Sequence, residues 1–156
     1  MSRGGLRLRI VSVGRDRDFT AAGVADYAER IGRGAELTLV ELRAETGPAA
    51  REREADALLL AHGKQKGAAE LWSLDQRGEE VTSEELARRI GRLRDAATAL
   101  TLCIGGDEGL SPRVREAARF NWALSRLTLP HRLARLVALE QLYRALEILR
   151  GSPYHK

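Results

Sequence analysis

Short apolar strand patterns alternate with helical segments along almost the whole chain, and this alternation restricts its fold more than any other feature. Strand patterns occupy 6–13, 37–42, 70–74 and 99–104, and a shorter apolar segment covers 122–129. Helical apolar spacing covers 19–31, and helices are also predicted at 48–61, 82–95 and 132–150. Such alternation predicts an α/β fold with a largely parallel sheet flanked by helices.

Local signals place several element ends. Thr82 and Glu85 have the spacing of a capping box, in which each side chain satisfies a backbone N–H of the other residue. Ser111 is a predicted helix cap, because Pro112 follows it at a position that tolerates the missing N–H. The polar run at 75–78 predicts a turn that ends the third strand.

The composition favours one domain over residues 1–156. The chain is 44% hydrophobic and carries no repeat or linker. No apolar run approaches the roughly 20 residues of a membrane span, and the first residues lack an apolar signal core, so we expect a cytoplasmic protein. Cys103 is the only cysteine, and the three histidines lie far apart, so we expect no disulfide and no metal site.

The net charge of +4 is unevenly distributed along the chain. From Leu110 onward the chain has nine basic and three acidic residues, a net charge of +6. Residues 1–109 carry a net charge of −2. A polyanionic partner is expected to meet the C-terminal third. Codon bias is an alternative explanation for the preference for Arg, which supplies 23 of 26 basic residues, but it does not explain the asymmetry.

The last predicted helix, 132–150, is apolar on every side. Leu136, Val137 and Ala138 project in three different directions at 100° per residue, and each has apolar companions further along. A helix of this kind must be covered on more than one side. We expect a symmetric homodimer with this helix in the interface, and the alternative is a central core helix.

The strongest local signal is the segment 103–112, in which an apolar strand leads through three glycines to a capped helix. Ligands bind beyond the carboxyl ends of parallel strands, where glycine allows close approach to the backbone. Asp107 and Glu108 would repel a phosphate, so an uncharged or cationic ligand is expected. The alternative is an ordinary strand-to-helix turn, and Cys103 is interpreted as a core residue.

Two further clusters follow. The run 124–131 combines apolar residues with Pro130 and His131, which indicates a loop beside a pocket; an edge strand and a capping histidine are the alternatives. At the chain end, Tyr154, His155 and Lys156 place an aromatic ring, an imidazole and a cation together. These groups suit unpaired RNA bases and phosphates, whereas the usual state of a terminus is disorder.

Together these clusters resemble one family. The chain is similar to the SPOUT-class (trefoil-knot) methyltransferases, and within them to the RlmH family of large-subunit rRNA pseudouridine N3-methyltransferases. The matching segments are Val11-Ser12-Val13-Gly14, Leu74-Asp75, Ile104-Gly105-Gly106, Glu108-Gly109-Leu110-Ser111, Leu124-Ser125, Leu127-Thr128-Leu129-Pro130-His131, Glu140-Gln141-Leu142-Tyr143-Arg144-Ala145 and Pro153-Tyr154-His155-Lys156.

The resemblance implies a C-terminal trefoil knot, an exception to the rarity of knotted chains, and S-adenosyl-L-methionine as cofactor. Family members often have Pro or Ala where this chain has Asp107, which affects the rim of the pocket and leaves the glycines intact. The implied cofactor-binding residues are Leu74, Gly105, Gly106, Leu124, Ser125, Arg126, Leu127, Thr128 and Leu129.

The implied reaction transfers a methyl group to N3 of a pseudouridine in 23S rRNA of the large ribosomal subunit, on the assembled ribosome. The N3 proton must leave, so the site requires a proton acceptor or a positive field. Candidate catalytic residues are Tyr154, His155, Arg144 and His131, with His155 as the candidate proton acceptor. In such sites the tail of one subunit commonly completes the pocket of the other.

RNA recognition is expected to rest on shape, because the chain has no separate RNA-binding module. The alternatives are a related enzyme with another target, such as a ribose 2′-hydroxyl or another base, and a catalytically silent ribosome-binding module. The predicted phosphate-facing residues are Arg113, Arg115, Arg119, Arg126, Arg132, Arg135 and Lys156.

The all-round apolar helix gives a first testable prediction. Light scattering over a range of protein concentrations is expected to report the mass of two chains, because a second copy covers the remaining apolar surface. A mass of one 17.2 kDa chain at every concentration would refute the dimer.

Overall fold

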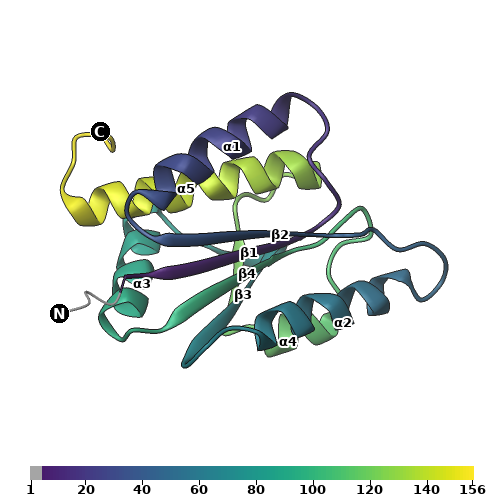
Figure 1. The fold of residues 1–156 in the computed structure, drawn as a ribbon. Helices are drawn as coiled ribbons and strands as arrows, with labels where there is room; N and C mark the ends of the chain where they lie inside the picture. The colour runs from purple at the N-terminus through teal and green to yellow at the C-terminus, as the bar shows by residue number, and fades with distance from the viewer. Residues whose placement is uncertain (1–4) are drawn as a thin grey trace.

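All four strand pairings in the sheet are parallel. The computed structural model describes residues 5–156, and these form one five-stranded sheet in the order β2-β1-β4-β3-β5 (Figure 1). The strands are β1 (Arg7–Val13), β2 (Glu36–Leu42), β3 (Ala69–Glu80), β4 (Ala99–Ile104) and β5 (Phe120–Ala123). The predicted α/β class with a parallel sheet is therefore confirmed.

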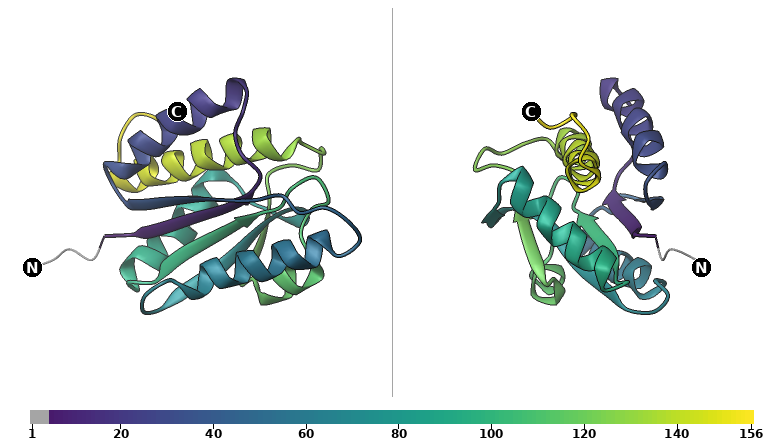
Figure 2. Two further views of the ribbon diagram at one scale, coloured as in Figure 1. Left: turned by 45° about the vertical axis from the view of Figure 1, so that its right-hand side comes forward. Right: turned by 90° about the vertical axis from the view of Figure 1, so that its left-hand side faces the viewer.

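Helices cover both faces of the sheet. The five helices of the described region are α1 (Phe19–Gly32), α2 (Ala50–Gly63), α3 (Ser83–Asp95), α4 (Pro112–Ala117) and α5 (His131–Arg150). Helices α1, α3 and α5 lie on one face, and α2 and α4 lie on the other, as the two views of Figure 2 show. The molecule thus has three layers, with α5 beside both α1 and α3.

The period-two pattern of the strands sorts the core into two clusters. In β1, Leu8 and Ile10 pack toward α1, α3 and α5, whereas Val11 and Val13 pack toward α2 and α4. Every residue of β4 is buried, because this strand lies at the centre of the sheet and is covered on both faces. This is the burial pattern expected of a parallel sheet.

The predicted helix caps at Thr82 and Ser111 are confirmed. The Glu85 backbone N–H donates to Thr82 Oγ1 at 3.1 Å, and the Thr82 N–H donates to a Glu85 carboxylate oxygen at 2.9 Å. Ser111 Oγ accepts from the Arg113 N–H at 3.2 Å. Ser111 also donates to Glu52 Oε1 at 2.7 Å, which ties the start of α4 to the first turn of α2.

Other predicted boundaries are wrong. Strand β3 does not end at the polar run 75–78 but bulges there and continues to Glu80, with Trp122 of β5 opposite both Leu74 and Glu79. A Cβ on Gly78 would lie 2.2 Å from the carbonyl oxygen of Asn121. Only glycine therefore allows the two strands to approach so closely here. The segment predicted at 122–129 is displaced: β5 ends at Ala123 and the rest is loop.

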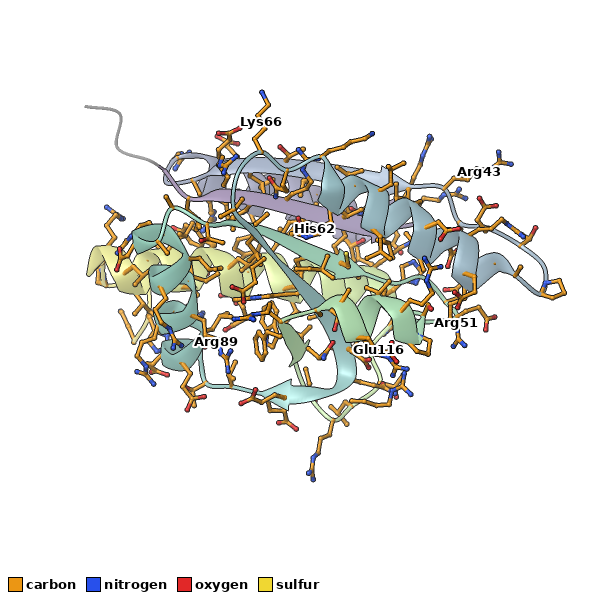
Figure 3. The ribbon with its side chains drawn as sticks, turned by 90° about the horizontal axis from the view of Figure 1, so that it is seen from below. Arg43, Arg51, His62, Lys66, Arg89 and Glu116 are labelled. Atoms are coloured by element: carbon orange, nitrogen blue, oxygen red, sulfur yellow. The ribbon has the colours of Figure 1, made fainter. Side chains whose placement is uncertain are left out.

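The predicted start and end of the second helix also differ from the structure. Helix α2 runs from Ala50 to Gly63, so it begins and ends two residues later than the predicted range 48–61. Seen from the side of α2 and α4, charged side chains such as Arg43, Arg51 and Lys66 project away from the ribbon (Figure 3). Across residues 5–156, no helix is long and apolar enough to cross a membrane.

Within one chain, α5 is only partly enclosed. Leu139 and Leu142 are buried against the sheet, α1 and α3, whereas Leu133 and Val137 remain half-exposed. Phe19, at the start of α1, is 75% exposed. The structure therefore places the helix in the core and leaves apolar surface along its length.

We expect the core contacts of α5 to dominate its stabilisation. Replacing Leu139, which has no exposed surface, with alanine should lower the free energy of unfolding by about 2–5 kcal/mol, since it leaves a cavity. Leu60→Ala on α2, where the side chain is 66% exposed, is the control and should change it by less than about 0.5 kcal/mol. Urea denaturation of both variants measures this; equal losses would contradict the packing described.

Candidate functional site

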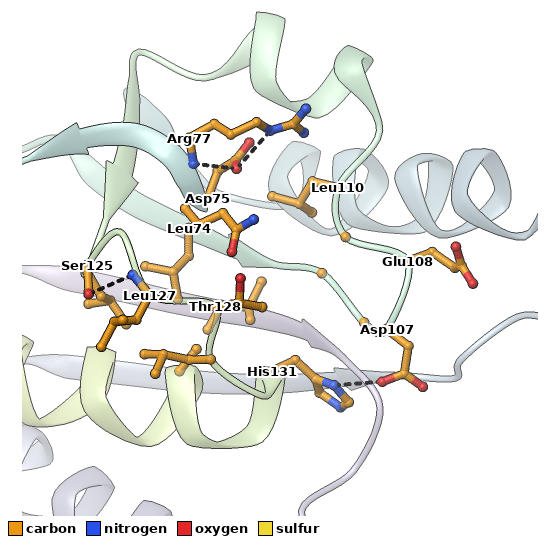
Figure 4. Close-up of a pocket in the computed structure, with 18 residues that line it drawn as sticks. Leu74, Asp75, Arg77, Asp107, Glu108, Leu110, Ser125, Leu127, Thr128 and His131 are labelled. Atoms are coloured by element: carbon orange, nitrogen blue, oxygen red, sulfur yellow. Dashed lines mark hydrogen bonds and ion pairs between the residues drawn. The ribbon is translucent and has the colours of Figure 1, made fainter.

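Three segments at the carboxyl edge of the sheet form one cavity. The bulge of β3 at 74–77, the end of β4 with its loop at 104–110, and the loop 124–129 after β5 contribute most of the lining, and His131 and Ala134 of α5 close one side (Figure 4). The cavity has a volume of about 410 Å³. This is the size and place at which open parallel sheets bind small ligands.

The glycine loop after β4 is tightly folded on itself. The Gly109 N–H donates to the Gly106 carbonyl at 3.0 Å, and Gly109 has φ of +72°. A Cβ on Gly105 would lie 2.7 Å from the carbonyl carbon of Gly109, and one on Gly106 would lie 3.0 Å from Val13 Cγ1. Packing therefore requires glycine at 105 and leaves little room for a side chain at 106, and the loop presents backbone to the cavity.

Carboxylates border the cavity. Asp107 is 90% exposed, and its Oδ1 lies 3.1 Å from His131 Nδ1. Asp75, whose side chain is largely buried, accepts from the Arg77 N–H at 3.0 Å and pairs with Arg115 at 3.4 Å. Glu108 is exposed beside them. Because Asp75 is paired with Arg115, the negative charge at the rim comes mainly from Asp107 and Glu108, and it favours a cationic ligand over an anionic one.

The loop after β5 presents apolar and small polar side chains to the same cavity. Leu124, Thr128 and Leu129 line it, and Ser125 Oγ accepts from the Leu127 N–H at 2.9 Å. The segment is thus a loop beside a pocket, and the edge-strand alternative is excluded.

The structure brings together eight of the nine predicted cofactor-binding residues. The exception is Arg126, which is 93% exposed, does not line the cavity and pairs with Glu80 at 3.4 Å. Prediction from sequence missed several lining residues, although most adjoin predicted positions at the strand ends. Asp107 and Glu108 line the cavity as expected, and the missed residues are Asp75, Gln76, Arg77, Ile104, Gly109, Leu110 and Ala134.

His131 is the first residue of α5 and lies at the cavity, while Pro130 occupies the capping position. A Cβ on Gly14 would lie 3.3 Å from His131 Nε2, so the imidazole lies closely over the end of β1. The contact with Asp107 and the close approach of Gly14 hold His131 at the rim of the pocket.

The tail lies at the other end of α5. Arg144 is 13 residues beyond His131, about 20 Å along a helix axis at 1.5 Å per residue. Gly151 ends the helix with φ of +74°, and the Ser152 N–H donates to the Glu147 carbonyl at 3.1 Å, which turns the chain back. One chain therefore does not bring its predicted tail residues to its own cavity.

The tail is held by specific contacts. Tyr154 donates from its hydroxyl to Glu140 Oε1 at 3.1 Å, and its ring packs edge-on against Tyr143 with centroids 4.7 Å apart. Arg144 donates to the same Glu140 oxygen at 2.8 Å. Burial, together with the hydrogen bonds to Tyr27 and Glu140, raises the pKa of Tyr154, so its hydroxyl stays protonated. The tail is an ordered part of the fold.

The predicted phosphate-facing arginines are mostly neutralised by carboxylates. Their closest partners are Asp56 for Arg113, Asp75 for Arg115, Glu80 for Arg126, Asp18 for Arg132 and Asp16 for Arg135. Within the described region, only Arg119 and Lys156 of the predicted set form no ion pair.

The prediction for Arg135 is wrong for the conformation seen here. Its side chain is 3% exposed, pairs with Asp16 at 3.0 Å and lies 3.8 Å from Glu41. It ties the loop after β1 to α5 and cannot reach a phosphate from this position. Counting charges along the sequence could not reveal this pairing, because Asp16 and Glu41 lie in the N-terminal half of the sequence and Arg135 lies in the C-terminal third.

Cys103 is a core residue. Burial in β4 raises the pKa of its thiol to about 12, so it is protonated at neutral pH and unsuited to nucleophilic chemistry. Between residues 5 and 156, no group of three or more His, Cys, Asp or Glu side chains is arranged to hold a metal ion.

Comparison with known proteins places this geometry in a family. A family model described as "Predicted SPOUT methyltransferase" matches residues 6–155. Ribosomal RNA large subunit methyltransferase H of Anaeromyxobacter sp. (strain Fw109-5) is 48% identical over 97% of this chain and its own full length. The protein of the same name from Limosilactobacillus fermentum is 37% identical over 97% of this chain and its own full length.

A solved structure agrees in fold. The probable methyltransferase from Bordetella pertussis Tohama I superposes with a TM-score of 0.54 at 20% identity, covering 92% of this chain and 96% of its own. This likeness supports the fold described above. By sequence over its whole length, and by fold, this chain belongs to the SPOUT methyltransferase family, among the full-length relatives named ribosomal RNA large subunit methyltransferase H.

Proposed function

We propose that this methyltransferase uses S-adenosyl-L-methionine to methylate N3 of a pseudouridine in 23S rRNA, on the assembled large subunit or whole ribosome in the cytoplasm. The observation that carries the proposal is the convergence of three sequence-distant segments on one glycine-lined, acid-rimmed cavity. The names of the full-length relatives support large-subunit rRNA as the substrate.

The cavity fits the proposed cofactor. Gly105 and Gly106 leave room for backbone contact that a Cβ would fill, and Leu74, Leu124 and Leu129 offer apolar surface suited to a nucleobase. The acidic rim at Asp107 suits a cationic sulfonium. When bound, the cofactor supplies the transferable methyl group; the residues of the chain orient both reactants and exclude water.

The target nitrogen must lose its proton to become nucleophilic. The candidate groups for accepting this proton, holding the base or stabilising the anion are Tyr154, His155, Arg144 and His131, with Lys156 as an additional cation. Because the raised pKa of Tyr154 keeps its hydroxyl protonated, we assign it to stacking or hydrogen bonding with the base and not to proton removal. Arg144 and Lys156 supply positive charge that stabilises the imide anion.

The complete site requires two chains in this proposal. The cavity and the tail of one chain lie about 20 Å apart along α5, so the tail of a partner subunit completes the cavity in a homodimer. Half-exposed Leu133 and Val137 and exposed Phe19 provide apolar surface for that contact. The expected trefoil knot remains a prediction, supported by the return of the chain from β5 to α5 on the opposite face from α4.

RNA contact is proposed through the exposed cations of the predicted set, without Arg135. Arg119 and Lys156 are the strongest candidates, because neither forms an ion pair within the described part of the chain. Arg113, Arg115, Arg126 and Arg132 would have to exchange a carboxylate partner for a phosphate, which weakens their contribution to binding.

The glycine loop gives a direct test of cofactor binding. Gly105→Ala places a Cβ against the Gly109 backbone and should weaken S-adenosylmethionine binding at least 10-fold, about 1.4 kcal/mol, in calorimetry. Gly32→Ala, which meets nothing within 4 Å at the end of α1, is the matched control and should bind normally. Equal affinities for the two variants would place the cofactor elsewhere.

Methyl transfer tests the substrate. With tritiated-methyl cofactor, label should enter whole ribosomes or large subunits and be recovered as N3-methylpseudouridine by nucleoside mass mapping. Removing residues 154–156 should reduce the rate by about 100-fold or more while cofactor binding is retained. Label on a ribose hydroxyl or another base would identify a different target, and cofactor binding without transfer to any ribosomal particle would indicate a silent module.

A further inference from the structure

His155 bridges two helices through its two ring nitrogens. Its Nδ1 lies 3.0 Å from Arg144 Nη1 on α5, and its Nε2 lies 2.8 Å from Glu84 Oε1 in the first turn of α3. Glu84 was not singled out by the sequence, and it is 71 residues away in the chain. The imidazole is therefore placed by groups outside the tail.

The identity of the two partners assigns the proton on the ring. A guanidinium has donors and no acceptor, so the Arg144 contact requires a lone pair on Nδ1. The hydrogen bonds to Glu140 raise the pKa of Arg144 further and keep it charged. In neutral His155 the proton must then be on Nε2, from which it donates to the Glu84 carboxylate.

The Glu84 carboxylate is suited to accept this proton. The hydrogen bond from His155 is the main cause that lowers the pKa of Glu84, so the carboxylate is ionised at neutral pH. The same arrangement of an imidazole that donates to a carboxylate fixes the tautomer and ring orientation of histidines elsewhere.

We propose that Glu84 is a positioning residue for the reaction: it holds His155 as the Nε2–H tautomer and so fixes the C-terminal tail for its place in the composite site. This inference rests on the proposed role of the tail. Both nitrogens of the anchored ring are engaged, so His155 offers no free lone pair to the N3 proton. That proton passes to water, and the anion is stabilised by Arg144 and Lys156.

The first measurement observes the tautomer directly. Long-range ¹H–¹⁵N spectra of histidine-labelled protein at pH 8 should show Nε2–H on His155, assigned among the three histidines by its loss in a His155→Asn variant. Glu84→Ala should weaken this preference, because only the Arg144 contact would then support the Nε2–H tautomer. A wild-type Nδ1–H tautomer or an imidazolium would overturn the anchor, whatever the activity.

The second measurement links the anchor to catalysis. Glu84→Ala should lower kcat about 10-fold with KM for the cofactor unchanged, because the tail is misplaced while the pocket is intact. Glu84→Gln keeps an acceptor oxygen and should recover activity to within about 3-fold of wild type. Glu36→Ala, at an exposed position on β2, is the control. Unchanged kcat in Glu84→Ala would overturn the positioning role.

The groups that face His155 are Glu84 on α3 and Arg144 on α5, with Glu140 and Tyr154 next to them. If wild type methylates no ribosomal particle, the proposed function fails, and the tautomer spectra still decide the anchor.

Discussion

Because every strand pairing is parallel, the bulge of β3 and the loops after β4 and β5 lie at the same edge of the sheet, and the whole cavity depends on this constraint. Within that edge, the loop after β4 is folded so tightly that Gly105 lies against its own chain at Gly109, and Gly106 lies close to Val13 of β1. A side chain on Gly105 would displace the loop, and one on Gly106 would press on Val13. The parallel sheet and the two glycines thus define a cavity into which cofactor, substrate and partner residues must fit.

The same fold separates the cavity from the C-terminal tail, which together make up the proposed site. Helix α5 begins at the cavity with His131 and ends at the tail, where Arg144, Tyr154 and His155 are anchored to α3 and to Glu140. A rigid helix keeps these groups apart in one chain. Under the proposed function, the ordered tail and the distant pocket belong to one site only if a second chain supplies the missing half.

Features governed by neighbours in the sequence were predictable, and those governed by distant contacts were not. The capping box at Thr82 and the cap at Ser111 depend on residues within three positions. The bulge in β3 escaped prediction because Gly78 is required by Asn121 on another strand. Arg135 was assigned to RNA because Asp16, its partner, lies far away in sequence. Eight of the nine residues that the resemblance assigned to the cofactor line the pocket, whereas Glu84 had no local signal.

The central claim is that the pocket of one subunit works with the tail of its partner, and mixed dimers test it most directly. Differently tagged Gly105→Ala chains and chains lacking residues 154–156 would be co-expressed, and the doubly tagged dimers assayed for methyl transfer to ribosomal particles. Neither parent dimer should be active, whereas each mixed dimer contains one intact composite site and should show about half the wild-type rate. Mixed dimers as inactive as both parents would contradict the account.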